Sequence, residues 1–448
     1  MLITKTTLGI SINTNLAMRM ALWLSILFVA LLVYDGAIRK WLLPSHERYV
    51  YLLKDLVLLG MVSLILLSRR WTLNDFRLQK IFLIPFLLYS LYVLTQALNP
   101  KLPNMLVGVW GIKNHLFYSL ITFSLLYSGL KVSEVFDAVR RLLPWIVLPV
   151  CAVALVQTVS PADSVWNDPV RGGQFYVASM ANNLVRTSAT FSYITGFAWY
   201  LQATTLLAVA LFFRGNRFDW LLMLWVTILL IALPTNGSRS VFVVLGASLS
   251  ILICALWHSK MITTLQIVKI VSGFCILALL SYVVFPDAWD ALIHRFLTSY
   301  TTPGDSARYW TIFTNAFSFF DLSGPFGFGA GAASQAAPFL APNLAPYSWL
   351  PPGIGARGFE EESGRVVLEL GVIGWGLSMS LRIALVLLSV RLLVLARSPD
   401  TKLTAAIALP ITLHATYVGS GVFAPPVGAA FLWFGVGLLL MGWREESK

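Results

Sequence analysis

The sequence predicts an all-α fold: a polytopic membrane helix bundle of about 12 transmembrane helices, forming a single integral membrane domain over residues 1–448. Composition is the first observation, since 58% of the residues are hydrophobic and only 12% are charged, with a mean hydropathy of +0.77. So little polar surface cannot cover a water-soluble globule. Several apolar runs also reach the roughly 20 residues that a helix needs to cross a bilayer, and the alternation typical of membrane strands is missing.

The predicted spans follow one another along the chain with one long interruption. They lie near residues 21–34, 51–68, 81–98, 112–130, 142–159, 190–213, 220–233, 241–257, 265–285, 366–396, 403–418 and 426–441. The first is followed by the charged stretch DGAIRK rather than by a small-residue cleavage site, which indicates a retained helix. The three cysteines fall within apolar spans, where they are packing residues, so no disulfide framework is indicated.

A net charge of +12 is compatible with nucleic-acid binding, but the placement of the basic residues argues for membrane topology instead. If the N-terminus is cytoplasmic, every connector on that side carries Lys or Arg, and together these connectors hold more than half of the 32 basic residues. The positive-inside rule requires this distribution. The sequence therefore predicts that both termini are cytoplasmic and that no nucleic acid is bound.

Topology does not explain the basic residues on the opposite, outer face. They include Arg39, Lys40, Arg171, Arg186, Arg239, Arg295, Arg308, Arg357 and Arg365. Arg239 stands in the short connector PTNGSRS, residues 234–240, between two apolar runs. An arginine at a helix end can be an interfacial anchor. Because the positive-inside bias disfavours arginine on this side, however, Arg239 is the first candidate for a functional cation.

The long outer segment covers residues 286–363, and it is too long for a simple turn and too apolar for a disordered linker. PDAWDALIHRFLTSY and DSARYWTIFTNAFSFF each place apolar residues at helical spacing. They predict short amphipathic helices that lie in the interface or pack as a lid. The stretch LSGPFGFGAGAAS contains Gly327 and Gly329, whose backbone N–H groups can turn toward an anion; a hinge or close helix packing is an equal alternative.

Outer arginines, a glycine-rich turn and nearby carboxylates together favour a site for a phosphorylated lipid. Guanidinium binds phosphate through two charge-assisted hydrogen bonds, and Arg186, Arg308 and Arg365 are candidates beside Arg239. Sugar transfer from a lipid pyrophosphate fits these residues, because the acidic leaving group needs positive charge rather than a general acid. A carboxylate or histidine would take the proton of the acceptor hydroxyl. Neither a metal nor another cofactor is indicated.

Four stretches resemble the O-antigen ligase and O-antigen polymerase superfamily of bacterial membrane proteins. They are RTSATFSYITGFAWYL, TNGSRSVFVVLGA, SARYWTIFTNAFSFFDLSGPFGFGAGA and ESGRVVLELGVIGWGL, and the resemblance covers roughly residue 186 to the end. It implies that Arg239 engages a lipid-linked pyrophosphate. Family ligases commonly carry a histidine about nine residues before the Glu of the ELGxxG stretch, whereas here that position, counted back from Glu369, is Glu360.

Glu360 and Glu362 are therefore the predicted candidates for the base. The alternative is that these acids form a solvated loop edge or pair with Arg357 and Arg365.

Three charged residues in or next to the first two predicted spans have an expected partner or position. Asp35 is expected to pair with Arg39 one helical turn later, and the adjacent Lys54 and Asp55 are expected to face the interior of the bundle.

The expected function is a metal-independent membrane glycosyltransferase that polymerises undecaprenyl-pyrophosphate-linked oligosaccharide repeat units at the periplasmic face of the bacterial inner membrane. One alternative is an O-antigen ligase that transfers the glycan to a lipid A core or another acceptor. Further alternatives are a secondary transporter or flippase and a non-catalytic partner in an export complex. The expected partners are the lipid-linked glycan, membrane lipid, and the chain-length regulator and flippase of the same pathway.

Overall fold

The computed structural model describes residues 14–68, 80–170, 184–214, 219–301, 314–352, 354, 362–416 and 425–447, and in these ranges it contains helices and no strands. Eight helical segments are long and apolar enough to cross a membrane. They belong to α1 (Thr14–Ala37), α2 (Glu47–Ser68), α6 (Val132–Val159), α7 (Ile194–Phe212), α9 (Arg239–His258), α10 (Thr264–Val284), α15 (Glu362–Leu395) and α17 (Pro426–Glu446). The chain is therefore a multi-pass helical membrane protein, and the number of twelve spans stays a prediction.

The other predicted spans coincide with shorter or interrupted helices. α3 (Lys80–Gln96) and α8 (Trp220–Ala232), which continues into the turn η7 (Leu233–Asn236), are apolar but short, and α16 (Pro399–Thr416) is also part of the bundle. The predicted span at 112–130 is divided into α4 (Met105–Ile112), the π-helical segment η4 (Lys113–Phe117) and α5 (Ser119–Tyr127). A π-helical segment breaks the regular α-helical spacing, and such breaks are frequent at functional sites.

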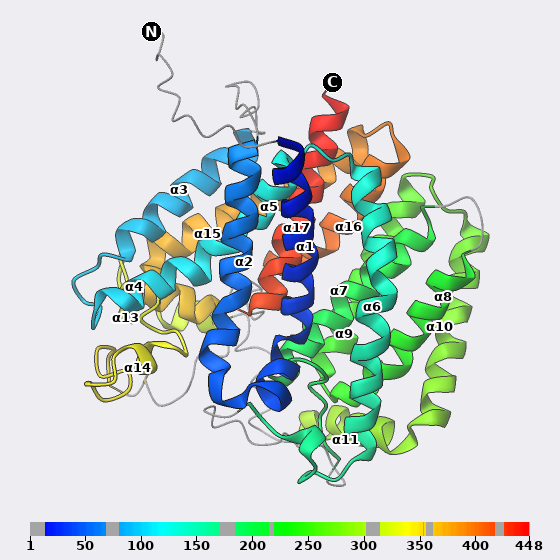
Figure 1. The fold of residues 1–448 in the computed structure, drawn as a ribbon, viewed down its shortest axis with the longest axis horizontal. Helices are drawn as coiled ribbons and strands as arrows, with labels where there is room; N and C mark the ends of the chain where they lie inside the picture. The colour runs from blue at the N-terminus through cyan, green and yellow to red at the C-terminus, as the bar shows by residue number, and fades with distance from the viewer. Residues whose placement is uncertain are drawn as a thin grey trace.

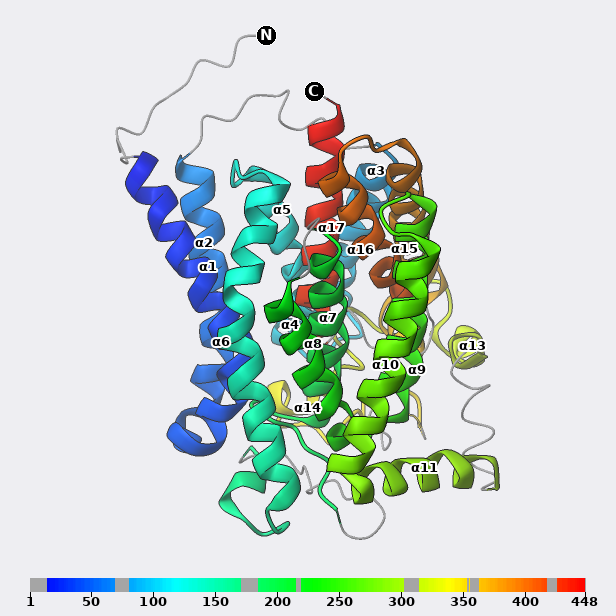
Figure 2. The ribbon, with the colours of Figure 1, turned by 90° about the vertical axis from the view of Figure 1, so that its right-hand side faces the viewer.

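The bundle is organised around α7 and α17, which are the most deeply buried of the candidate spans. α17 packs against α5, α7 and α16, while α16 also contacts α9 and α15. α1 and α2 form a pair on one side, and α10 lies at the periphery on the other, with almost all of its residues facing outward (Figure 2). The apolar outer surface of α10 is what a bilayer would cover.

Two ends of the bundle can be distinguished. The start of α1 and the end of α17 lie at one end, together with the connectors α5–α6 and α9–α10 (Figure 1). We call the opposite end the far end: it holds the segment after α1, η7, and α11 (Pro286–Thr301). Three segments here carry the outer basic residues Arg39, Arg239 and Arg295.

α11 confirms the helix predicted from PDAWDALIHRFLTSY. It runs crosswise beneath α10 (Figure 2), burying Ala288, Ala291 and Leu292 while Ile293 and Leu297 stay exposed. This arrangement suits a helix lying along the surface of the membrane. Residues 305–313 of the helix predicted from DSARYWTIFTNAFSFF are outside the described part. Further along the segment come the short helices α13 (Phe320–Ser323) and α14 (Ala337–Leu340).

α15 is not one continuous helix, because it breaks at Gly371, where φ is 68° and ψ is −175°. Glu362 Oε1 lies 2.6 Å from Arg382 Nη2, although the two residues would be about 30 Å apart along a straight helix. Trp375 Nε1 also donates to Ser363 Oγ, at 3.0 Å. Residues 362–370 therefore fold back along the beginning of the following helix, and only the second part continues across the bundle.

Candidate functional site

The turn between α8 and α9 holds Arg239 at the far end. Gly237 follows η7 with a left-handed backbone, φ 61° and ψ 16°, which glycine adopts at little cost, and α9 begins at Arg239. The sequence PTNG thus reverses the chain and places this guanidinium in the first turn of a 20-residue helix. The helix dipole adds partial positive charge at the same place, so the turn favours a negatively charged group.

Arg239 and Arg295 are joined through backbone carbonyls. Arg239 Nη1 donates to the carbonyl of Arg295 at 2.8 Å, and Arg295 Nη1 donates to the carbonyl of Gly237. Both arginine residues are half-buried. A carbonyl orients the guanidinium without neutralising it, because it carries no net charge. The packing of α11 against the turn therefore fixes two cations next to each other.

Arg186 reaches the same turn from the segment that precedes α7. Its Nε donates to the carbonyl of Asn236 at 3.2 Å. The segment is held there by the buried Thr187, whose N–H donates to the Thr235 carbonyl at 3.0 Å, and the buried Asn236 side chain donates to the Ile194 carbonyl. The structure thus brings together two of the predicted site residues, Arg186 and Arg239, and adds Arg295. We call these three residues the turn arginines.

Arg365 belongs to a second group, on the folded-back part of α15. Its Nε lies 3.9 Å from Glu369 Oε1, and both side chains are buried. Glu369 Oε2 lies 2.7 Å from His115 Nε2, and His115 Nδ1 lies 2.8 Å from the Tyr89 hydroxyl. A neutral imidazole that carries its proton on Nε2 satisfies both contacts. His115 was not among the residues predicted from the sequence, although a histidine inside a predicted span is itself a signal of function.

Gly327 and Gly329 have φ values of 71° and 104°, as a glycine-rich turn requires. The N–H groups of this turn do not face an open space: Gly327 donates to Ser323, Phe328 to Leu368 and Gly329 to Glu369, each at 2.8–3.0 Å. The last two bonds satisfy the carbonyls of Leu368 and Glu369 at the break in α15, where the helix no longer provides partners. These contacts fit the alternative of close helix packing, and the binding of an anion by Gly327 and Gly329 stays a prediction.

Glu362, a predicted base, is an ion-pair partner of Arg382 in the bundle interior. The 2.6 Å contact joins two side chains that are each 1% exposed. Arg382 also donates to the carbonyl of Ala415 at 2.7 Å and to Ser378 Oγ at 3.2 Å. A carboxylate bound in this way connects the fold-back to α16, and the partner is Arg382 rather than the neighbouring Arg365.

Lys54 and Asp55 face the interior, as expected, and each belongs to a buried ion pair. Lys54 Nζ lies 2.8 Å from Asp35 Oδ2, and Lys113 Nζ lies 2.7 Å from Asp55 Oδ2. The two ammonium groups lie 3.7 and 4.2 Å from the centre of the Tyr51 ring. The expected Asp35–Arg39 pair is wrong. The chain changes to π-helical geometry after Ala37, so the four-residue spacing no longer aligns the two side chains, and Lys54 reaches Asp35 from α2.

Two candidate residues, Arg308 and Glu360, lie outside the described residues, as do Arg171 and Arg357. Within the described ranges, no cluster of three or more His, Cys, Asp or Glu side chains could hold a metal ion.

No protein-family model matches this chain, and no curated protein matches it either.

Proposed function

We propose that this chain is a membrane glycosyltransferase that uses a lipid-pyrophosphate sugar donor at the far end of the bundle. The observation that carries the proposal is the convergence of Arg186, Arg239 and Arg295 on one turn. Guanidinium groups attract anions, so an anionic group that binds near this turn would interact favourably with all three of them. A pyrophosphate matches this arrangement because guanidinium forms paired hydrogen bonds with phosphate oxygens.

In the proposed reaction, an acceptor hydroxyl oxygen attacks the anomeric carbon of the donor sugar. The bond from that carbon to the pyrophosphate oxygen breaks, and the pyrophosphate leaves with the electron pair. The turn arginines stabilise the negative charge that develops on the departing oxygen. Because pyrophosphate is already a weak base, no group has to protonate it, and only the hydroxyl proton needs an acceptor.

For the proton acceptor we propose Glu369 beside the sequence-based candidates Glu360 and Glu362. One oxygen of Glu369 is held by His115, and the other lies toward Arg365. Glu362 is engaged by Arg382, so its proposed role requires that this ion pair opens. Glu369→Gln and Glu362→Gln separate the two. If Glu369 is the base, Glu369→Gln lowers the transfer rate at normal protein levels, whereas Glu362→Gln acts on folding.

Polymerisation of undecaprenyl-pyrophosphate-linked repeat units at the periplasmic face of the bacterial inner membrane is the preferred form of the reaction. Glutamates stand where the ligases keep a histidine, which favours polymerase over ligase. The distinguishing experiment is incubation of the purified protein with a lipid-pyrophosphate oligosaccharide, followed by separation of the products by size. A ladder of products indicates a polymerase, and a single addition to a second acceptor indicates a ligase.

The test of the site is Arg239→Ala, compared with Arg214→Ala as a control. Arg214 is a partly buried arginine at the other end of the bundle, where it pairs with Asp137 and Asp400. Removing one charge-stabilising donor is expected to lower transfer by about 10²–10³-fold, whereas the control keeps wild-type activity. Unchanged product length and amount in Arg239→Ala, at normal protein levels, would disprove the assignment.

A secondary transporter or flippase is the second candidate, because one observation favours it. Discontinuous helices and buried charges inside a membrane bundle are typical of transport pathways, and here α15 breaks at Gly371 close to the His115–Glu369 pair. A transporter would move an unmodified lipid-linked sugar across liposomes that contain the purified chain. Flux without any new glycosidic bond would support this candidate and exclude the transferase.

A further inference from the structure

The π-helical segment η4 lies between two groups of buried charged residues. Lys113, its first residue, pairs with Asp55 on α2. His115, two positions later, contacts Glu369 on the folded-back part of α15 and the Tyr89 hydroxyl on α3. One short segment therefore contacts α2 through one side chain and α15 through another, and the reaction proposed above gives no role to this connection.

The π-helical geometry explains how Asp55 is bound. Lys113 Nζ lies 2.7 Å from Asp55 Oδ2, and the hydroxyl of Tyr118, directly after η4, donates to Asp55 Oδ1 at 3.1 Å. In an α-helix, residues five positions apart point about 140° away from each other. In a π-helix the i→i+5 hydrogen bonds place them one turn apart instead. Asp55 thus holds two side chains that a wide turn brings to the same side.

On the other side of η4, only one oxygen of Glu369 has a close partner. Oε2 lies 2.7 Å from His115 Nε2, whereas Oε1 lies 3.9 Å from Arg365 Nε, too far for a hydrogen bond. Among the described residues, Glu369 Oε1 and the Nε and Nη2 atoms of Arg365 are buried and have no hydrogen-bond partner. Buried polar atoms without partners are costly, so this group is only partly satisfied.

A second arrangement would satisfy more of these atoms. Arg365 and Glu369 are four positions apart on a helical segment, a spacing that suits an ion pair, and a movement of about 1 Å would bring them into a charged hydrogen bond. Glu369 would then leave His115. Tyr347 is also near, since burial and then the charge of Glu369 raise its pKa. Its hydroxyl, however, donates to the Ser334 carbonyl at 3.2 Å.

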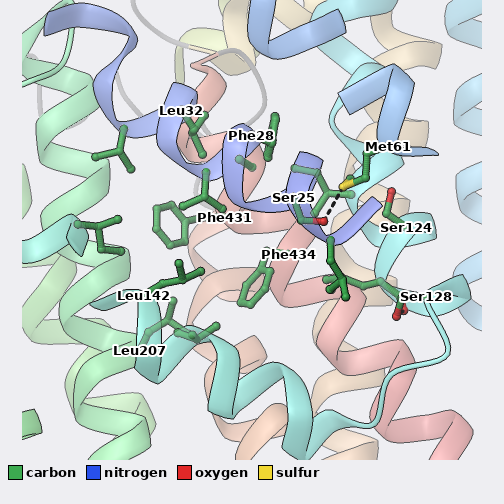
Figure 3. A pocket seen from close by; sticks show the side chains of 18 of the residues that line it. Ser25, Phe28, Leu32, Met61, Ser124, Ser128, Leu142, Leu207, Phe431 and Phe434 are labelled. Carbon is green, nitrogen blue, oxygen red and sulfur yellow. Dashed lines mark hydrogen bonds between the residues drawn. The ribbon is translucent and has the colours of Figure 1, made fainter. Parts of the chain in front are cut away.

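The helix that follows η4 has space on one side. An apolar cavity lies between α1, α2, α5, α6, α7 and α17, and Ser124 and Ser128 of α5 are at its wall (Figure 3). A π-helical turn contains about one residue more than an α-helical turn. If η4 takes α-helical spacing, the extra residue has to be accommodated in the neighbouring helix, and the cavity leaves room for this adjustment beside α5.

We propose that η4 is a two-state element through which Asp55 controls the partner of Glu369. In the structure, Asp55 holds both ends of η4, the segment is π-helical, and His115 binds Glu369. In the second state one contact of Asp55 opens, η4 takes α-helical spacing, His115 turns away and Glu369 closes on Arg365. Both partners already lie within 4 Å of Glu369, so the exchange needs only a small movement.

The exchange does not depend on the transfer reaction, because it concerns only contacts within the chain. If Glu369 is the proton acceptor proposed above, its Oε1 is free while His115 holds Oε2 and is occupied once Arg365 binds it. The state with the Arg365 pair would then be inactive. A contact on α2 would in this way regulate a carboxylate on α15.

The experiment follows His115 by solid-state NMR of the purified full chain in phosphatidylcholine bilayers, with nitrogen-15 in its histidines. The chain has five histidines, and the signal of His115 is the one that is lost in His115→Asn. Glu369→Gln supplies the reference for His115 without its carboxylate. Asp55→Asn should move the His115 signal at least half of the way to this reference. A signal that stays at its wild-type position would overturn the proposal.

Asp35→Asn is the matched control, because Asp35 pairs with Lys54 and not with η4. It should leave the His115 signal unchanged, and a shift equal to that of Asp55→Asn would contradict the proposal. Thermal unfolding shows whether each variant is folded. If Asp55→Asn is not, Tyr118→Phe removes only the hydroxyl that binds Asp55 Oδ1. It should shift the signal in the same direction by a smaller amount, and no shift in this variant would equally overturn the proposal.

Arg365→Leu tests the partner to which Glu369 moves. Added to Asp55→Asn, it removes the alternative partner, so at least half of the shift in the His115 signal should be reversed. A shift that persists in the double variant would show that Glu369 does not close on Arg365, and the second state would be wrong.

Coupling in the opposite direction is measured by thermal unfolding. Because Asp55 and Glu369 act on one two-state element, the effects of Asp55→Asn and Glu369→Gln on the unfolding temperature should not add up in the double variant. The effects of Asp35→Asn and Glu369→Gln should add up. Additive effects in both pairs would contradict the coupling through η4.

This inference and the proposed function fail independently. A His115 signal that responds to Asp55→Asn, in a chain without any transfer activity, removes the transferase assignment and leaves the two-state element. Transfer that depends on Arg239, together with a His115 signal that ignores Asp55→Asn, removes the two-state element alone.

Discussion

The turn arginines and Arg382 place the same type of side chain in two different environments. Arg239 and Arg295 lie half-buried at the end of the bundle and donate to backbone carbonyls, whereas Arg382 is 1% exposed and lies 2.6 Å from the carboxylate of Glu362. A carbonyl fixes the direction of a guanidinium, and a carboxylate also cancels its charge. The buried pair holds residues 362–370 against the rest of α15, whereas the carbonyl contacts hold α11 against the turn between α8 and α9.

The largest expected loss of stability follows from breaking the buried Glu362–Arg382 ion pair. Glu362→Ala should lower stability by about 3–5 kcal/mol, because it leaves the Arg382 guanidinium buried without its carboxylate. Thermal unfolding in detergent measures this. Replacing both residues by apolar ones, Glu362→Leu with Arg382→Met, should recover most of the loss. Equal instability of the single and double variants would mean that the pair is not the source of the effect.

The next effect concerns the fold-back that makes this pair possible. In Gly371→Ala the backbone stays at φ 68° and ψ −175°, a region that is occupied almost only by glycine, which costs about 1–3 kcal/mol. The new Cβ would lie 2.3 Å from the Pro325 carbonyl, an overlap that adds about 1–3 kcal/mol. Gly376→Ala is the control on the same helix, since a Cβ there meets nothing within 4 Å. Similar unfolding temperatures for the two variants would contradict the break at Gly371.

A smaller effect, on transfer rather than on folding, is expected at the turn. Arg186→Gln keeps a donor for the Asn236 carbonyl but removes the charge, so transfer should fall by about 10–100-fold, the range for one charged hydrogen bond, with an unchanged unfolding temperature. Arg186→Lys keeps the charge and should retain intermediate activity. If Arg186→Gln and Arg186→Lys have equal transfer activity, the position of the segment before α7, and not the charge at residue 186, determines the transfer rate.

The smallest effect is expected where an arginine is paired but partly exposed. Arg214 contacts Asp137 and Asp400, with 21% of its own side chain and 52% and 29% of theirs exposed. Water screens such pairs, and Arg214→Ala should cost at most about 1 kcal/mol. A larger loss of stability would show that burial does not explain why the Arg382 pair is expected to stabilise the fold more than the Arg214 pairs.

The spans could be predicted because their signal is local. An apolar run of sufficient length selects a helix in a bilayer wherever it occurs, and the amphipathic spacing of residues 286–301 likewise selected α11. The turn arginine Arg239 was predictable for the same reason, since one charge between two apolar runs has to lie at an end of the bundle.

The partners of buried charges were not predictable from local spacing. His115 and Glu369 are 254 positions apart in the chain, and Lys54 displaces Arg39 as the partner of Asp35 because a neighbouring helix comes closer than the next turn. The glycines at 327 and 329 were identified as turn residues, but what their N–H groups contact depends on the broken α15.

The sequence by itself determined that this chain is a helical membrane protein, because the length and the hydrophobicity of each apolar run are local properties. Only the tertiary structure decided that three arginines meet at one turn, that residues 362–370 fold back, and that Glu362 pairs with Arg382. These outcomes depend on which distant segments pack together, and hydrocarbon spans of similar composition do not encode their neighbours locally.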